Sequence, residues 1–178
     1  MRIRLVGSAV LATFLLCDGA PALDIPKAVQ EELDHFRMTC RENGSDISDP
    51  LRALRWEDLD GDGRLDAIIE AEKARCTEGY SPYCGTAGCM LILLRALPNG
   101  RFRTLFSDQV WSFEILGDGK RKRMRFQLHG GFCGRAGAEG CTKEVPVTGR
   151  PLALRQGRAE TRMRRQYAEG RRTAPGVL

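Results

Sequence analysis

Apolar residues recur at helical spacing between Asp24 and Asp46. Four of them are separated by four, three and four positions and so share one side of a helix: Val29, Leu33, Phe36 and Cys40. Asp24 can cap the start of this helix, Pro26 suits its first turn, and Asn43-Gly44 is a C-terminal stop signal. The pattern predicts one amphipathic helix near the N-terminus.

Beyond the helix, the pattern changes to short runs rich in branched apolar residues, which are typical of strands. Three such runs cover residues 65–73, 90–97 and 101–108. The letters "PNG" at 98–100 supply turn chemistry between the last two runs. These runs predict a β-hairpin preceded by a further strand.

Two alternating runs within residues 111–130 flank "GDGK", where Gly117 and Gly119 can take positive φ, and they predict a second hairpin. Residues 143–154 close the series, and Pro146 marks an edge position because proline cannot donate to a β-ladder. Short strands joined by tight turns favour an antiparallel meander. We therefore predict an α+β fold, with the N-terminal helix packed on an antiparallel β-meander and disulfides stapling the domain.

The first residues of the chain predict export. Two arginines precede an apolar run at 5–16, and the small residues "APA" follow at 20–22. This order is typical of a secretory signal peptide at 1–22, cleaved after Ala22. Cys17 leaves a lipoprotein site as an alternative, which the bulky residue before it disfavours. We expect a periplasmic or secreted protein without a transmembrane span once the signal is removed.

Charge separates the rest of the chain into a body and a tail. The whole sequence carries a net charge of +5, whereas residues 150–178 hold eight arginines and two glutamates. The slight acidity therefore belongs to residues 23–149, and we expect a single domain at 23–155 followed by a basic, flexible tail at 156–178. The arginines could bind an anionic surface, but without an aromatic stacking pattern we favour a solvated tail and expect no nucleic-acid partner.

The stretch "DLDGDGRLD" at 58–66 carries the candidate chemistry. A hard cation such as Ca²⁺ takes six to eight oxygen ligands, and alternate aspartates can wrap one if the backbone turns tightly between them. Gly63 stands where such a loop needs its sharp turn. The candidate ligands are the side chains of Asp58, Asp60, Asp62 and Asp66 and the backbone carbonyl of Arg64.

This loop departs from an EF-hand at its twelfth position, where Ile69 replaces the bidentate glutamate. It resembles instead the D-x-D-x-D-G-x-x-D loops of FG-GAP and VCBS-type β repeats, in which a strand follows the ninth-position acid. The ion-free alternative is an acidic turn in which four like charges repel. That repulsion favours Ca²⁺, and the lack of a nearby histidine or free thiol disfavours zinc.

An even number of cysteines in an exported chain predicts disulfides. Beyond the signal they are Cys40, Cys76, Cys84, Cys89, Cys133 and Cys141, and no C-x-x-C occurs. Fifteen connectivities are open. Short spacing favours Cys84 with Cys89 and Cys133 with Cys141, which leaves Cys40 for Cys76.

His129 and Cys133 could form a Cys–His nucleophile pair, but an oxidised Cys133 and a histidine that ends a strand form the favoured interpretation. His35 is interpreted as a helix-flank residue. The order of the motifs at about 30–155 resembles a group of uncharacterised exported proteins of Gram-negative bacteria. The resemblance implies a periplasmic, calcium-bound and disulfide-stapled domain, and it implies no known activity because the group has none assigned.

Three functions follow from the sequence. The favoured one is a binding or interaction module with a structural Ca²⁺, acting on a protein or envelope ligand rather than as an enzyme. The alternatives are a cell-envelope hydrolase that uses the acidic loop or His129, and an anionic-surface binder that uses the arginine-rich tail.

Overall fold

The computed structural model describes residues 24–47, 49–152 and 154 of the chain. The predicted signal peptide at 1–22 and the predicted basic tail at 156–178 lie outside these residues. Within them, the structure has one α-helix, α1, at Lys27–Glu42. It has eight strands, which are β1 (Leu54–Glu57), β2 (Asp66–Glu70), β3 (Cys84–Gly85), β4 (Gly88–Ala96), β5 (Phe102–Val110), β6 (Ser112–Leu116), β7 (Arg123–Leu128) and β8 (Cys141–Pro146). Four short 3₁₀ turns connect them at Pro50–Ala53, Ala71–Lys73, Gly119–Arg121 and Gly130–Cys133.

The strands form two antiparallel sheets. In the first sheet, β1 pairs with β2, β2 with β4, and β4 with β5. The short β3 pairs with β4 at Cys84 and Cys89, on the same side of β4 as β2, because β5 pairs along the opposite side. The second sheet has the order β6-β7-β8, with Pro146 on the edge strand β8. The predicted α+β class and antiparallel pairing are confirmed, and the single predicted meander is divided between two sheets.

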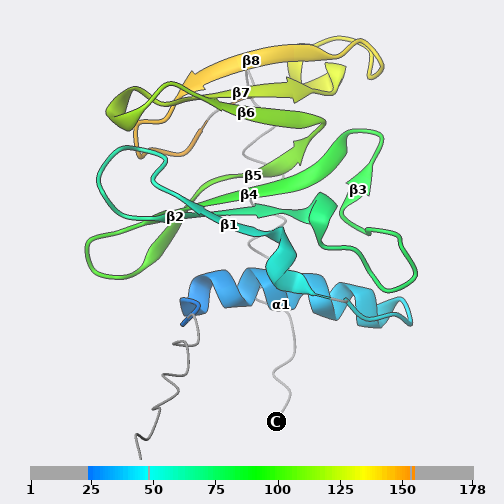
Figure 1. Ribbon diagram of the computed structural model, residues 1–178. Coiled ribbons are helices and arrows are strands. Elements are labelled where there is room, and N and C mark those ends of the chain that lie inside the picture. Colours follow the sequence, from blue (N-terminus) through cyan, green and yellow to red (C-terminus); the bar gives the residue numbers. More distant parts are fainter. Residues whose placement is uncertain (1–23, 48, 153, 155–178) are drawn as a thin grey trace, which may run out of the picture.

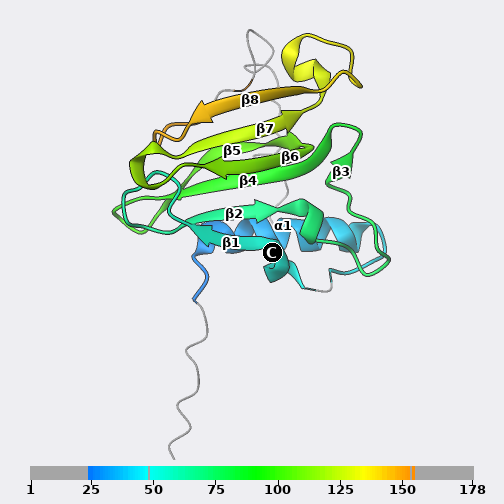
Figure 2. The same ribbon diagram turned by 45° about the horizontal axis from the view of Figure 1, so that its top comes forward.

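Figure 1 shows α1 along one side of the five-stranded sheet and the three-stranded sheet on the other side. One buried cluster contains the helical stripe and residues of the first sheet, including Val29, Leu33, Phe36, Ala67, Ile69 and Ile92. A second cluster contains residues of both sheets, including Ile68, Leu91, Leu93, Met124, Phe126 and Leu128. Figure 2 shows the same order of layers from a second direction.

Strand β2 lies in the middle of this arrangement and is buried on both faces. Ala67 and Ile69 belong to the helix-side cluster, whereas Ile68 between them belongs to the inter-sheet cluster. Successive side chains of a strand point to opposite faces, so a strand covered on both sides needs an uninterrupted apolar run. This explains why "AIIE" does not alternate.

One residue, Trp111, separates β5 from β6, so the chain passes directly from one sheet to the other. The Trp111 indole N–H donates to the carbonyl of Thr86, at 2.9 Å. A Cβ on Gly140 would clash with the indole ring, so only glycine fits there. Trp111 thus joins the 84–89 loop and the 133–141 loop at the corner between the sheets.

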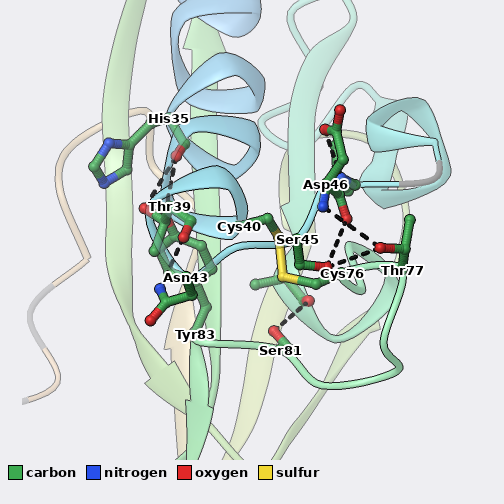
Figure 3. The surroundings of a disulfide bond; sticks show 12 residues. His35, Thr39, Cys40, Asn43, Ser45, Asp46, Cys76, Thr77, Ser81 and Tyr83 are labelled. Atoms are coloured by element: carbon green, nitrogen blue, oxygen red, sulfur yellow. Dashed lines mark hydrogen bonds between the residues drawn. A yellow bond between two sulfur atoms is a disulfide. The ribbon is translucent and has the colours of Figure 1, made fainter.

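Three disulfides join cysteines of the described residues: Cys40–Cys76, Cys84–Cys89 and Cys133–Cys141. These are the pairs that spacing favoured. Cys40 and Cys76 are both buried, and Figure 3 shows the polar contacts around their bond. The hydroxyls of Ser45 and Thr77 lie 2.8 Å apart there, and the Thr77 N–H donates to the carbonyl of Asp46 at 2.7 Å. Disulfides of this kind are typical of an oxidising, extracytoplasmic compartment.

Several predicted boundaries need correction. The helix begins after Pro26, which makes no side-chain cap, so the prediction that Asp24 caps it is wrong. The predicted strand at 65–73 ends at Glu70 because a 3₁₀ turn takes residues 71–73. Strand β1 was not predicted. The positive φ angles of Gly117 (77°) and Gly119 (48°) are confirmed.

No helix within the described residues has the length and apolar character needed to cross a membrane.

The three disulfides differ in the length of chain that they close, which predicts different contributions to stability. Replacing Cys40 and Cys76 together by alanine should lower the free energy of unfolding by about 4 kcal/mol, against about 2 kcal/mol for Cys84 with Cys89. The longer loop loses more freedom in the unfolded chain when it is closed. Chemical denaturation of the two double variants checks this order, and equal losses would contradict it.

Candidate metal centre

The acidic loop is the hairpin connection between β1 and β2, because Glu57 pairs with Asp66 across its base. Gly61 and Gly63 take positive φ angles of 72° and 86°, a conformation that glycine adopts without steric cost. A side chain on Gly61 would also collide with the backbone at Gly119 and Lys120. The glycines therefore let the loop turn and rest on the β6–β7 turn.

The carboxylate of Asp58 organises the loop backbone. Its Oδ1 accepts the N–H groups of Gly61 (2.7 Å) and Asp62 (3.1 Å), and its Oδ2 accepts that of Gly63 (2.9 Å). Lys122 adds a contact from the β6–β7 turn, since its ammonium donates to the carbonyl of Asp58 at 2.8 Å. A first-position aspartate in this role fixes the turn and still leaves one lone pair, on Oδ2, for a cation.

Asp66 is fully buried, and among the described residues it is the only charged residue in the buried class. One carboxylate oxygen accepts the N–H of Leu59 at 2.9 Å, and the other accepts the N–H of Ala96 at 2.8 Å. Burial raises the pKa of Asp66, the two hydrogen bonds oppose this, and the charges of Asp60 and Asp62 raise it further. The carboxylate thus ties the loop to the end of β4.

Asp60 and Asp62 face the guanidinium of Arg95, which comes from β4. Arg95 Nε forms an ion pair with Asp60, and Arg95 Nη2 lies 2.9 Å from Asp62 Oδ2. Asp62 also pairs with Arg64. Burial opposes ionisation of Asp62, but the Arg64 N–H and the charges of Arg64 and Arg95 outweigh it and lower its pKa. The premise that the four carboxylates repel without compensation is therefore wrong.

Carboxylate oxygens of Asp58, Asp60 and Asp66 lie within 4.8 Å of one another and could hold a metal ion. The side chain of Asp60 is 5% exposed, and its Oδ1 is buried without a hydrogen-bond partner. A buried acceptor without a donor is costly, and a cation would satisfy it. All donors in this cluster are oxygens, which suit a hard cation.

The structure brings the side chains of three predicted ligands together, Asp58, Asp60 and Asp66, and the predicted role of the Arg64 backbone carbonyl stays a prediction. The Asp62 carboxylate faces the two arginines, and the Arg64 guanidinium pairs with Asp62 and donates to the carbonyl of Ala96. Sequence reasoning missed Arg95, although a lone charge near the end of the apolar run "MLILLRAL" was a usable signal.

His129 follows β7 directly, and its Nδ1 accepts the N–H of Gly131 at 3.2 Å. Its ring lies edge-on to Trp111, with 6.1 Å between centroids. Cys133 is bonded to Cys141 and is not a free thiol. Within the described residues no ion pair joins a carboxylate to His129. His35 lies on α1, edge-on to Tyr83.

A shallow, open groove lies between β1, β2 and β6. It is lined by Arg55, Glu57, Glu70, Lys73, Phe113, Glu114 and Ile115. Arg55 pairs with Glu57 and Glu70, and Lys73 pairs with Glu70 at 2.7 Å. The groove is therefore a surface of mixed polarity with compensated charges.

Comparisons of the chain with family models, curated proteins and solved structures found no match. The resemblance to exported six-cysteine proteins stays a prediction.

The two hydrogen bonds of Asp66 predict that Asp66→Asn destabilises the protein in the absence of a metal. The new amide group would leave the N–H of Leu59 or of Ala96 without an acceptor, at a cost of about 1–3 kcal/mol. Removing the negative charge of Asp66 raises the free energy of unfolding by less than this, because Arg95 already compensates the neighbouring charges of Asp60 and Asp62. Urea denaturation in the presence of a chelator measures the loss.

The matched control is Asp118→Asn, since the Asp118 side chain is 87% exposed. We expect the stability of this variant to equal that of the parent. An Asp66→Asn protein as stable as the control would contradict the bridging role of the carboxylate.

Proposed function

We propose that this chain is a periplasmic or secreted interaction module, stapled by disulfides and stabilised by one structural Ca²⁺. In this proposal α1 packs on one face of the five-stranded sheet, and the acidic loop fixes the β1–β2 hairpin that it connects. The observation that carries the calcium assignment is the cluster of Asp58, Asp60 and Asp66 with the unpartnered, buried Asp60 Oδ1.

The chemistry of the donors favours Ca²⁺ over other ions. The cluster offers carboxylate oxygens, and zinc would prefer nitrogen or sulfur ligands. Mg²⁺ demands near-ideal octahedral geometry, whereas Ca²⁺ accepts irregular sets of oxygens. Carboxylate oxygens of Asp58 and Asp66 already accept backbone N–H groups, so the oxygens that remain for an ion form an irregular set of ligands.

A structural role suits this position better than a catalytic one. Asp66 begins β2, the strand buried on both faces, and its carboxylate contacts the backbone at the end of β4. An ion bound here would hold two central strands in register. No specific observation favours the hydrolase alternative, since Nδ1 of His129 accepts a backbone N–H and Cys133 is oxidised. The surface-binding alternative concerns residues 156–178, outside the described part of the chain.

Calcium should raise the melting temperature of the protein above its value in chelator. Free Ca²⁺ at about 100 times its Kd adds about 2.7 kcal/mol to the free energy of unfolding, which corresponds to about 10 °C for a domain of this size. Asp60→Asn should abolish the shift because it weakens the ligand whose Oδ1 is unpartnered. Scanning calorimetry with calcium, magnesium and chelator measures the shift.

Asp118→Asn is again the control, since it removes an equivalent charge from the neighbouring turn and should keep the full shift. Identical melting temperatures of the parent protein with calcium and with chelator would refute the calcium assignment.

The interaction role predicts that the folded chain retains a specific component of a cell-envelope extract. The immobilised protein should capture it in the presence of calcium and should lose it after reduction, because the three disulfides maintain the folded surface. Mass spectrometry of the eluates identifies the component. Retention no greater than on the reduced, unfolded protein would contradict an interaction role.

A further inference from the structure

Arg95 lies on β4, 33 positions from Asp62 in the sequence, and its guanidinium occupies the acidic loop. It pairs with Asp60 through Nε and with Asp62 through Nη2. These are the third- and fifth-position residues of the loop, two of the carboxylates that the spacing assigns to a cation. The side chains are largely shielded from water, with 21% of Arg95, 5% of Asp60 and 19% of Asp62 exposed.

The guanidinium hydrogen-bonds Asp62 through Nη2 but leaves one carboxylate oxygen of Asp60 without a donor. Arg95 Nε contacts Asp60 Oδ2, whereas Asp60 Oδ1 is buried and has no hydrogen-bond partner. The ion pair therefore supplies charge but leaves an oxygen directed at no donor. A divalent cation among Asp58, Asp60 and Asp66 would satisfy that oxygen.

A cation at that position and the guanidinium in its present place repel each other. Both are positive, both depend on Asp60, and shielding from water strengthens their mutual repulsion. A long arginine side chain on a strand can move its head group while its backbone stays in the ladder. The two positive groups are thus alternatives for one set of carboxylates.

The surroundings of Arg95 limit that movement. A Cβ on Gly149 would lie 2.8 Å from Arg95 Cζ and 2.9 Å from Asp60 Oδ2, so the backbone at Gly149 covers the ion pair. This segment is held by Arg103, which donates to the Gly149 carbonyl, and by the N–H of Val147, which donates to the carbonyl of Lys122 at 3.0 Å. Withdrawal of the guanidinium therefore has to displace the backbone at Gly149 or pass beneath it.

We propose that Arg95 is an internal competitor for the cation, which holds the acidic loop together when calcium is low and is displaced from Asp60 when calcium binds. The inference rests on the proposed calcium site. In this view the site is not permanently occupied, because its affinity for Ca²⁺ depends on the exchange of Arg95 for the ion at Asp60. The loop keeps its shape without the ion, and the cost of moving Arg95 lowers its affinity for Ca²⁺, so occupancy follows the calcium concentration of the surroundings.

The test is the Arg95→Gln variant, compared with the parent chain. Isothermal titration with Ca²⁺ should show at least about a tenfold gain in affinity, because the competing charge is gone. The melting temperature in chelator should fall, because Asp60 and Asp62 lose their counter-ion.

Arg103→Gln is the matched control. Arg103 is the cross-strand neighbour of Arg95 and also contacts Gly149, but no ion pair joins it to a carboxylate of the loop among the described residues. This variant should bind calcium with the affinity of the parent. A gain as large as that of Arg95→Gln would overturn the exchange, since loosening of the Gly149 segment would then explain both.

The outcomes separate the exchange from the calcium function. Calcium binding by the parent, with equal or weaker binding by Arg95→Gln, overturns the exchange and keeps the site. Binding by Arg95→Gln alone supports the competition and refutes calcium function for the native chain. Binding by neither refutes both.

If Arg95→Gln does not fold, the NMR signal of the Arg95 Nε–H in the parent protein provides the test. This signal should shift when calcium is added, while the Nε–H signal of Arg103 stays in place. An Arg95 signal that does not move overturns the proposal.

Discussion

The buried carboxylate of Asp66 is the contact on which the arrangement around the acidic loop depends. Its two oxygens accept backbone N–H groups from Leu59, within the loop, and Ala96, at the end of β4. A fully buried carboxylate is stable only when it is well hydrogen-bonded or paired. Those two bonds therefore fix where the loop ends and where β2 begins relative to β4. The same register places Arg95, one residue before Ala96, beside the remaining aspartates.

The sequence predicted the elements whose patterns are long or regular and missed those decided by tertiary contacts. The helical stripe from Val29 to Cys40 and the glycine turns were readable because spacing alone determines them. Strand β1 has only four residues, "LRWE", and although they alternate between apolar and polar, the run is too short to mark a strand by itself. The division into two sheets depends on Trp111, a single residue at which one long extended run changes sheet. A pattern of strands does not reveal such a corner.

The acidic site was predictable as a loop but not as an electrostatic unit. Alternating aspartates and the glycines at 61 and 63 identified the turn, and the structure gathers Asp58, Asp60 and Asp66. The compensating charge comes from β4 and reaches the loop only because of strand register. Local sequence reasoning therefore overestimated repulsion in the ion-free loop. It also did not predict that both oxygens of Asp66 accept backbone N–H groups, one from the loop at Leu59 and one from the distant strand β4 at Ala96.

Covalent and ionic restraints are divided between the two ends of the molecule. Figures 1 and 2 show the loop between β1 and β2 at one end, and the C-terminal end of α1, β3 and the 133–141 loop at the opposite end. The disulfides all belong to that opposite end, where each limits the unfolded chain whatever ion is present. No disulfide restrains the acidic loop within the described residues, so its stability depends on hydrogen bonds and on the balance of its charges. Arg95 supplies part of this balance from within the fold, and in the proposed exchange it would let the loop fold without a cation. In the same proposal the side chain that a cation would move is Arg95, at the end of the molecule that no disulfide restrains.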